Sequence, residues 1–343
     1  MIGMDIFDDR AFSAIEMTMA IDRVGFVPGY LSRLSGLLQD IPVRTTKVMI
    51  DSRENVPRIV PFSERGAPIP NRTRSRANVR DFRTSRIAEK ATVHAHELLD
   101  LRAFGRDSVL ASVQEEVALR QALVRKDMEL THEYHLLNVV QGYQLDADGS
   151  QMYDWYNEWG ANPAPTVFFD LLASSPADDH LWNRCVGVNR GIARELEKLG
   201  IINPPQVQAL CGDAFFDKTV RHPNVTKLYE GHAAFLRFQN IEGRTWRSFE
   251  YGDIMFHNYR GTQNGEVAIG TNDVKFFPTG VGIFQRALSP GEKLEFHGTL
   301  GREVYADTKI DPDGEWVDFR LRTYPLYVCT VPQALRQGSL GAS

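Results

Sequence analysis

The spacing of apolar positions changes several times along the chain, and the longest regular stretch predicts a helix. It covers residues 108–141, with Asp107 or Ser108 as a possible cap and Gly142 as a stop. About 34 residues rising 1.5 Å each make a rod of roughly 50 Å, about three times the average globular helix. We therefore predict one long structural helix. Half of its surface would carry the apolar side chains Val109, Val113, Val117, Leu123, Val124, Met128, Tyr134 and Leu137.

Shorter patterns on either side of this helix predict a mixed fold. The β-branched run at 45–50 predicts a strand, and the four prolines and one glycine of 51–71 predict a long excursion from the core. Asp-Ala-Asp-Gly at 146–149, between apolar and aromatic residues, predicts a hairpin. Residues 164–200 have a helical pattern, and short strands and turns follow. The fold class that we predict is α+β.

The composition indicates an ordinary globular protein. The chain has 343 residues, of which 43% are hydrophobic and 24% charged, enough for one large domain or two smaller ones. No apolar run approaches the ~20 residues that span a bilayer. The first ten residues hold three acids before the first base, the reverse of a signal peptide. We expect neither a membrane span nor export by that route.

The cysteines argue against a disulfide framework. Cys185, Cys211 and Cys329 are odd in number, far apart and in no C-x-x-C pair. This pattern favours buried free thiols and a reducing compartment.

The histidine pairs do not fit a metal site. His132 and His135 are three residues apart, whereas a zinc protease helix needs two histidines four apart with a glutamate between them. His94 and His96 would share one face of a strand, but no cysteine or carboxylate cluster stands near them. We predict no metal ligands.

The remaining motifs also give no catalytic or cofactor site. The acidic stretches 146–149 and 311–314 begin like calcium loops, yet Gly149 falls at position 4 where an EF-hand needs glycine at position 6. Both stretches therefore predict turns. The phosphate-binding, dinucleotide-binding and nucleophile-elbow motifs are absent from the sequence. We predict that the protein is not an enzyme and needs no cofactor.

One short segment concentrates positive charge although the chain has a net charge of −5. Residues 71–87 hold six arginines against a single acid, Asp81, and the first three arginines alternate with small residues, so an extended chain would show them on one face. The six arginines are Arg72, Arg74, Arg76, Arg80, Arg83 and Arg86.

Three interpretations of this segment remain open: a nucleic-acid site, a solvated surface and a contact between subunits. A nucleic-acid groove usually adds aromatic platforms, and the segment has only Phe82. Arginine also pairs well with carboxylates across protein interfaces. Because the rest of the chain is rich in acids, a second copy would supply partners, and we favour the subunit contact.

Several motifs, in their order and spacing, resemble the tailed-phage major capsid protein family of the lambda type. They cover about residues 40–335. The matching stretches are TTKVMID, PFSERGAPIPNR, RIAEKATVHAHELLDLRAFG, THEYHLLNVVQG, LDADGSQMYDWY, LCGDAFFDKTVRHPNVTKLY, YGDIMFHNYRG, FFPTGVGIFQRALSPGE, TLGREVYADT and RTYPLYVCTVPQAL.

The resemblance implies the major capsid fold of tailed phages and herpesviruses, with four parts. They would be an N-terminal arm, an extended loop, a peripheral domain with a long spine helix, and an axial domain. On this chain the arm would be residues 1–45 and the extended loop residues 46–92. The peripheral domain would be 93–160, with the spine helix at about 108–141, and residues of about 300–325 would complete this domain. The axial domain would be 161–299 plus 326–343.

The resemblance also implies a function in assembly. Many copies would form hexamers and pentamers of an icosahedral head that encloses double-stranded DNA without sequence-specific contact. Scaffolding and portal proteins, and a decoration protein in some relatives, would be further partners. The virion would be the final location and the host bacterial cytoplasm the place of assembly. The arginines from Arg72 to Arg86 would dock on a neighbouring subunit. The alternative is a sequence-independent nucleic-acid-binding protein that uses this same segment.

Overall fold

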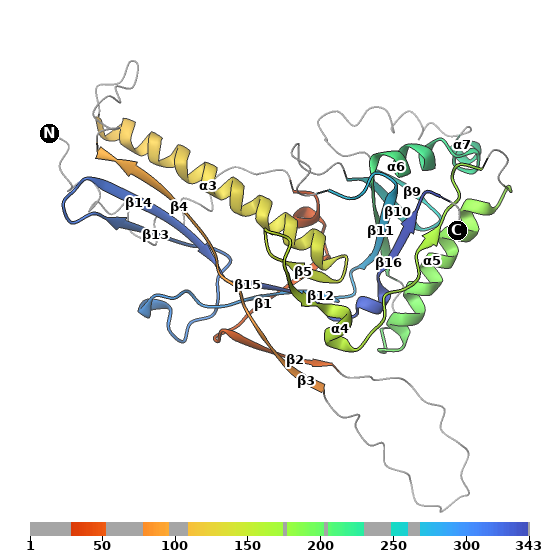
Figure 1. Ribbon diagram of the computed structural model, residues 1–343, viewed down its shortest axis with the longest axis horizontal. Helices are drawn as coiled ribbons and strands as arrows, with labels where there is room; N and C mark the ends of the chain where they lie inside the picture. The colour runs from red at the N-terminus through yellow and green to blue at the C-terminus, as the bar shows by residue number, and fades with distance from the viewer. Residues whose placement is uncertain are drawn as a thin grey trace, which may run out of the picture.

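The molecule is elongated, with two structured ends and a ribbon that projects between them (Figure 1). A long helix and a small sheet form one end, and a larger sheet with three helices forms the other. The computed structural model describes residues 29–52, 78–95, 109–173, 177–201, 205–229, 248–259 and 268–341. Among these residues, no helix combines the length and the apolarity that crossing a membrane requires.

The predicted long helix is present as α3, Val109–Val139. Gly142, at φ +91°, ends the turn after it, and a Cβ there would collide with the ring of Tyr156. Val124, Met128 and Leu137 are buried as predicted, but Leu123 is 52% exposed. The prediction of a single apolar half was therefore wrong at Leu123, because no described element covers the helix there.

The end of the molecule that carries α3 is a two-layer unit, which we call the wing. Its sheet has the antiparallel order β13-β14-β4, with the helix packed on one side. The strands are β4 (Ile87–His94), β13 (Tyr305–Ile310) and β14 (Trp316–Thr323). The predicted turn at 311–314 joins β13 to β14, with Gly314 at φ +79°.

The other end, which we call the body, contains a six-stranded mixed sheet in the order β7-β16-β11-β8-β10-β9. Its strands are β7 (Val167–Phe168), β8 (Gln206–Cys211), β9 (Ser248–Tyr251), β10 (Ile254–Asn258), β11 (Asp273–Thr279) and β16 (Arg336–Ser339). Three helices accompany this sheet: α5 (His180–Glu197), α6 (Asp213–Val220) and α7 (Pro223–Tyr229).

The prediction of a helix over 164–200 was wrong in its first half. Residues 167–168 form β7, which pairs in parallel with Gly338 and Ser339 of β16, and α5 begins only at His180. Pro163 and Pro165 disfavour helical backbone before them, and the pairing partner lies about 170 residues away, where no local pattern reports it.

A third sheet, in the order β1-β12-β15, lies between wing and body (Figure 1). It contains β1 (Leu38–Pro42), β12 (Phe284–Leu288) and β15 (Pro325–Cys329), with β1 parallel to β12. The short 3₁₀ turns are η3 (Leu31–Arg33), η4 (Leu294–Phe296) and η5 (Pro332–Ala334).

Two hairpin-like pairs complete the fold. β5 (Tyr143–Leu145) and β6 (Gln151–Asp154) form the hairpin predicted at 146–149, and α4 (Trp155–Trp159) follows with Asp154 as its N-cap. β2 (Lys47–Ser52) confirms the predicted strand and pairs with β3 (Asn78–Arg83) in an antiparallel ribbon.

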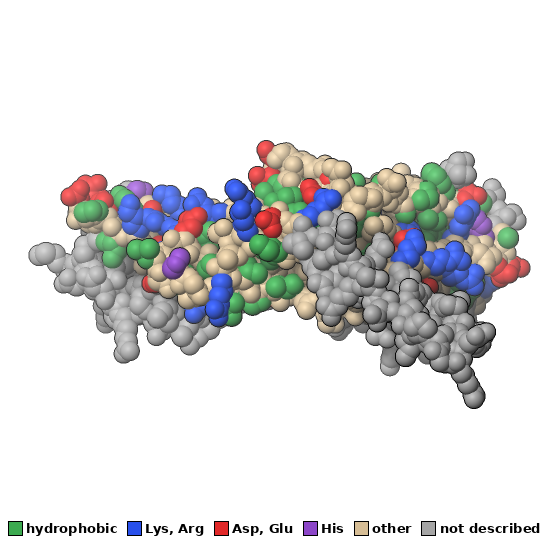
Figure 2. All heavy atoms as spheres, turned by 90° about the horizontal axis from the view of Figure 1, so that it is seen from below, with side chains coloured by type: hydrophobic (Ala, Val, Ile, Leu, Met, Phe, Trp, Pro, Cys, Tyr) green, Lys and Arg blue, Asp and Glu red, His purple; other side chains and the backbone are tan. Residues whose placement is uncertain are grey.

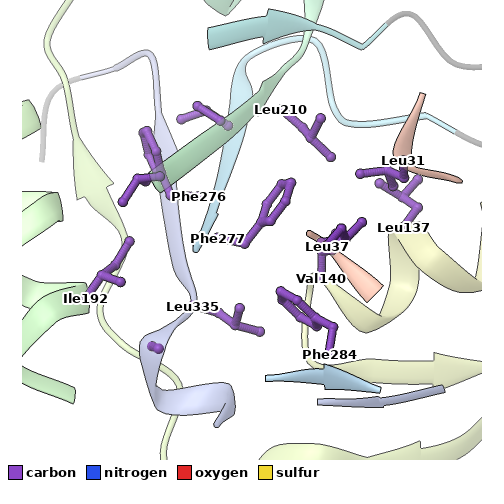
Figure 3. Close-up of a cluster of buried hydrophobic side chains, with 14 of the residues drawn as sticks. Leu31, Leu37, Leu137, Val140, Ile192, Leu210, Phe276, Phe277, Phe284 and Leu335 are labelled. Carbon is purple, nitrogen blue, oxygen red and sulfur yellow. The ribbon is translucent and has the colours of Figure 1, made fainter. Parts of the chain in front are cut away.

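The main hydrophobic core joins the body to the C-terminal end of α3 (Figure 3). Phe276 and Phe277 of β11 point to opposite sides of their strand. The side of Phe277 meets Phe284 of β12, at a ring distance of 6.1 Å, and residues from α3 and the 31–37 segment. All three cysteines are buried free thiols, as predicted. The division into arm, loop, peripheral domain and axial domain stays a prediction.

Candidate subunit interface

The ribbon formed by β2 and β3 is fastened to the molecule on one face only. Phe82 lies opposite Val48 in the register, and both are buried. The ring of Phe82 makes edge contacts with Trp155 at 5.2 Å and Trp159 at 5.7 Å. Because strand side chains alternate, Lys47 and Met49 point to the other face, where both are exposed. The ribbon therefore presents a free face at a fixed position.

Three of the six predicted interface arginines lie in the described chain. Arg80, on β3, pairs with Glu158 at 3.0 Å, and Arg86 pairs with Glu292 at 3.3 Å. Arg83 is exposed. Both ion pairs are partly exposed and each contributes about 0–1 kcal/mol, so they position the side chains without burying them. Arg72, Arg74 and Arg76 lie outside the described residues, and the interface role of all six stays a prediction.

An open groove of about 740 Å³ runs beside β2. Its walls are mainly apolar, and the lining contains two bases, Arg44 and Lys47, but no carboxylate. Met49 and Leu300, at the groove, are 71% and 49% exposed. The other lining residues are Ile41, Pro42, Val43, Thr45, Val48, Ile50, Trp159, Leu199, Ile201, Gln285, Thr330 and Val331. A basic, apolar groove of this kind suits an acidic and apolar partner.

Glu133, near the C-terminal end of α3, fixes the start of the described chain. Its carboxylate accepts hydrogen bonds from the backbone N–H groups of Tyr30 (2.9 Å), Leu31 (2.8 Å) and Ser32 (3.1 Å), and from the hydroxyl of Tyr259 (3.1 Å). Burial and the charge of Glu133 both raise the pKa of Tyr259, which therefore stays protonated and donates. The carboxylate is 4% exposed and fully engaged.

Glu133 therefore ties residues 30–32 to α3. It stands between the two histidines weighed as metal ligands, but its partner Leu31 is 102 residues away in the chain. No spacing rule connects positions so far apart, so no pattern along the chain indicates this role.

The two histidines of α3 are structural. The Nδ1 of His132 shares a short hydrogen bond with the hydroxyl of Tyr327, and the ring of His135 stacks on Tyr327 at 5.6 Å. Burial, with Arg286 nearby, lowers the pKa of His132 to about 3, so its ring is neutral. His94 lies on β4, exposed, and His96 lies outside the described residues. Within the described ranges no three His, Cys, Asp or Glu side chains come together as metal ligands.

Arg286 holds the central sheet together by charge. Its guanidinium donates to both carboxylate oxygens of Asp40, at 2.7 and 2.8 Å, and to Glu303 at 2.8 Å. The Arg286 side chain is only 11% exposed, and the two-pronged pairing with Asp40 joins β12 to β1.

Charges of both signs are mixed along the molecular surface. On the face shown in Figure 2, lysines and arginines alternate with aspartates and glutamates from one end of the molecule to the other.

Comparison with known proteins gives matches to phage capsid proteins. A family model described as phage major capsid protein E matches residues 13–340. A major capsid protein of Salmonella phage Felix O1 is 24% identical over 94% of this chain and 95% of its own length. A major capsid protein of Pseudomonas phage KPP10 is 28% identical over 55% of this chain and 56% of its own length.

The fold is also similar to solved capsid structures. A chain from the mature capsid of bacteriophage PhiM1 superposes with a TM-score of 0.54, at 7% identity, over 93% of this chain and 89% of that one. At this identity the likeness concerns the fold alone, and it confirms the predicted α+β capsid fold. Together the matches favour the shell protein over the nucleic-acid-binding alternative.

Proposed function

The chain belongs to the phage major capsid protein E family, and we propose that its activity is assembly, not turnover. As the major capsid protein of a phage, it is a component of the virion. Many copies associate into hexamers and pentamers, and these close into an icosahedral head. The observation that carries the proposal is the family match over residues 13–340, nearly the whole chain.

Symmetry explains how one chain builds a shell. A surface that fits a different surface of the next copy closes into a ring when the rotation allows it. A single exposed ion pair contributes little, but each subunit touches several neighbours, and multivalency makes its loss from a closed ring slow. Small contacts therefore suffice when many act together.

The arginine segment is our first candidate for such a contact. We assign Arg72, Arg74, Arg76, Arg80, Arg83 and Arg86 to the surface that docks on an adjacent copy. The base of this segment is fixed by Phe82, and Arg83 is exposed on β3. Fixing the base reduces the conformational entropy lost when the segment docks.

Further partners follow from the same role. Scaffolding and portal proteins would act during assembly in the host bacterial cytoplasm, a decoration protein would bind the finished head, and double-stranded DNA would fill it. A chain with net charge −5 suits a DNA container, because a strongly basic lining would hold the duplex through released counterions and slow its entry.

Electron microscopy of the purified full-length protein tests the function. We expect shells, rings or tubes under assembly conditions. Monomers that persist at all concentrations, with the fold intact by circular dichroism, would refute a self-assembling shell protein.

A charge-reversal series tests the arginine segment. Arg72→Glu, Arg74→Glu and Arg76→Glu, singly and together, should reduce the assembled fraction while the monomer keeps its melting temperature, because repulsion replaces attraction only between copies. Arg190→Glu with Arg194→Glu, on the exposed side of α5, is the matched control. Normal shells from the triple variant would remove the segment from the interface.

A further inference from the structure

The outer side of α3 carries an apolar ridge that no other described element covers. Leu119 and Leu123 are about one helical turn apart on the same side of α3, and they are 57% and 52% exposed. Asp127 continues the row one turn later and is also exposed. Exposed leucines in a row on a rigid helix are the kind of feature that marks a contact surface.

Among the described residues, the acidic end of this ridge has no cation paired with it. Glu89, on β4, lies close enough to Asp127 for their charges to interact, and partial burial together with Asp127 raises the pKa of Glu89. Neither carboxylate forms an ion pair with any residue of the described chain. Two neighbouring carboxylates of this kind would gain from a cation supplied by another molecule. We define the ridge as Leu119, Leu123, Asp127 and Glu89.

The groove beside β2 has the opposite character. Its lining combines apolar side chains, including the exposed Met49, with Arg44 and Lys47, and it includes no acid. Within the described residues, Arg44 and Lys47 have no ion-pair partner either. The groove thus offers apolar surface and positive charge where the ridge offers apolar surface and negative charge.

The two surfaces belong to different parts of the molecule. The ridge lies in the middle of α3 and on the neighbouring strand β4, whereas in Figure 1 β2 lies below the central sheet, on the ribbon that points away from α3. One subunit therefore cannot bring its own ridge into its own groove. The arrangement is heterologous, the kind that closes into rings when repeated.

We propose that the ridge of one copy docks in the β2 groove of the next copy, with Asp127 and Glu89 facing Arg44 and Lys47. The proposal rests on the assembly function given above and adds to it a second contact, made entirely by described residues. The leucines of the ridge enter the apolar groove, and the two charge pairs set the register between the copies.

A charge swap within one chain tests the pairing. Arg44→Glu with Lys47→Glu, and separately Glu89→Lys with Asp127→Lys, should each lower the assembled fraction at least about tenfold, because every interface then joins like charges. The chain with all four changes restores opposite charges at every interface and should assemble within about twofold of the wild type. Arg190→Glu with Arg194→Glu is the control for surface charge. If the variant with all four substitutions is folded by circular dichroism but assembles no better than the two double variants, the pairing is overturned.

Cross-linking gives a second readout that does not depend on charge. The native cysteines are 0% exposed, so only an introduced pair of cysteines can form disulfides between copies. Met49→Cys with Leu123→Cys should give an oxidised ladder up to the capsomer size, whereas each single change should not. If the double-cysteine variant forms shells but no cross-linked oligomers, this contact is refuted and the assembly function is unaffected. If the wild-type protein forms no shells, the assembly function itself is refuted. A ladder formed by Met49→Cys with a cysteine in residues 1–28, and not with Leu123→Cys, would place the acidic N-terminal segment in the groove and overturn the proposal.

Discussion

The body and the wing use different means to hold the same chain together. The body shares a large core of aromatic and aliphatic side chains that reaches from α5 to the end of α3, and Phe256, Phe276 and Phe277 are 0% exposed. The wing has a separate, small core on one side of its sheet. It consists of Val93, Val124, Met128, Ala306, Val317, Phe319 and Leu321.

Charged groups also link the strands of the wing. Asp318, on the central strand β14, accepts from the hydroxyl of Thr92 at 2.7 Å and from Lys90 at 3.3 Å. Asp307, on β13, lies 3.6 Å from both Arg322 and Lys293. A single sheet covered by one helix buries one layer of side chains, so polar pairs across the strands supply part of its stability.

This difference suggests that assembly affects the stability of the wing and of the body differently. The body is stabilised by burial, which salt hardly affects, whereas the wing depends partly on ion pairs that salt screens. The wing also carries the exposed ridge of α3. We therefore expect neighbouring copies to stabilise the wing more than the body.

The largest effect should come from the core of the body. Phe276→Ala removes a fully buried ring that stacks on Phe169 at 5.6 Å, and the unfolding free energy should fall by about 3–5 kcal/mol. Urea unfolding followed by fluorescence measures this change. Leu294→Ala, at a side chain that is 95% exposed, is the control and should change little. A loss below about 1 kcal/mol would mean that the body is not the more strongly packed end.

A pH titration probes α3 where it joins wing and body. The pKa of His132 is about 3 in the folded protein and 6.5 ordinarily, so below pH 6.5 the unfolded chain binds more protons. Stability is therefore complete above pH 6.5 and falls as the pH decreases toward 3, by up to about 1.4 kcal/mol per pH unit. His132→Gln should make the urea midpoint of unfolding depend less on pH between pH 5 and 7. His94→Gln, at an exposed position, should leave this dependence unchanged. An unchanged slope in His132→Gln would assign the pH dependence to other groups.

The smallest effect should come from the wing. Burial opposes ionisation of Asp318, but hydrogen bonds from Thr92 and Lys90 outweigh it and lower its pKa. Asp318→Asn weakens these bonds and should cost about 1–2 kcal/mol, seen as faster hydrogen exchange in β14 than in β11. Asp313→Asn, at the exposed turn, is the control. Equal acceleration in both strands would show that wing and body unfold as one unit.

Local patterns were enough to find the long helix, the strand at β2 and both glycine turns. Each of these elements is specified by neighbours within a few residues, through caps, alternation or turn residues. The number and spacing of the cysteines also predicted the buried free thiols. The family resemblance added the capsid fold, which the comparisons confirm.

Local patterns failed where a distant segment decides the environment. The sequence predicted helix at Val167 and Phe168, which instead form a strand paired with β16. It predicted that Leu123 lies on the apolar side of the helix, but no described element covers this residue. Glu133 reads as an ordinary surface acid of a helix, yet it is buried among backbone N–H groups from 30–32. In each case the partner is far away in the chain or absent from the subunit.

The sequence by itself therefore determined the long helix, the strand β2, the two glycine turns and the family to which the chain belongs, because propensity, turn chemistry and motif order are local or linear properties. The tertiary structure alone decided which surfaces are left over: the groove with Arg44 and Lys47, and the ridge with Asp127 and Glu89. Exposure and charge pairing depend on what packs from elsewhere in the chain, so these surfaces exist only once folding has placed everything else.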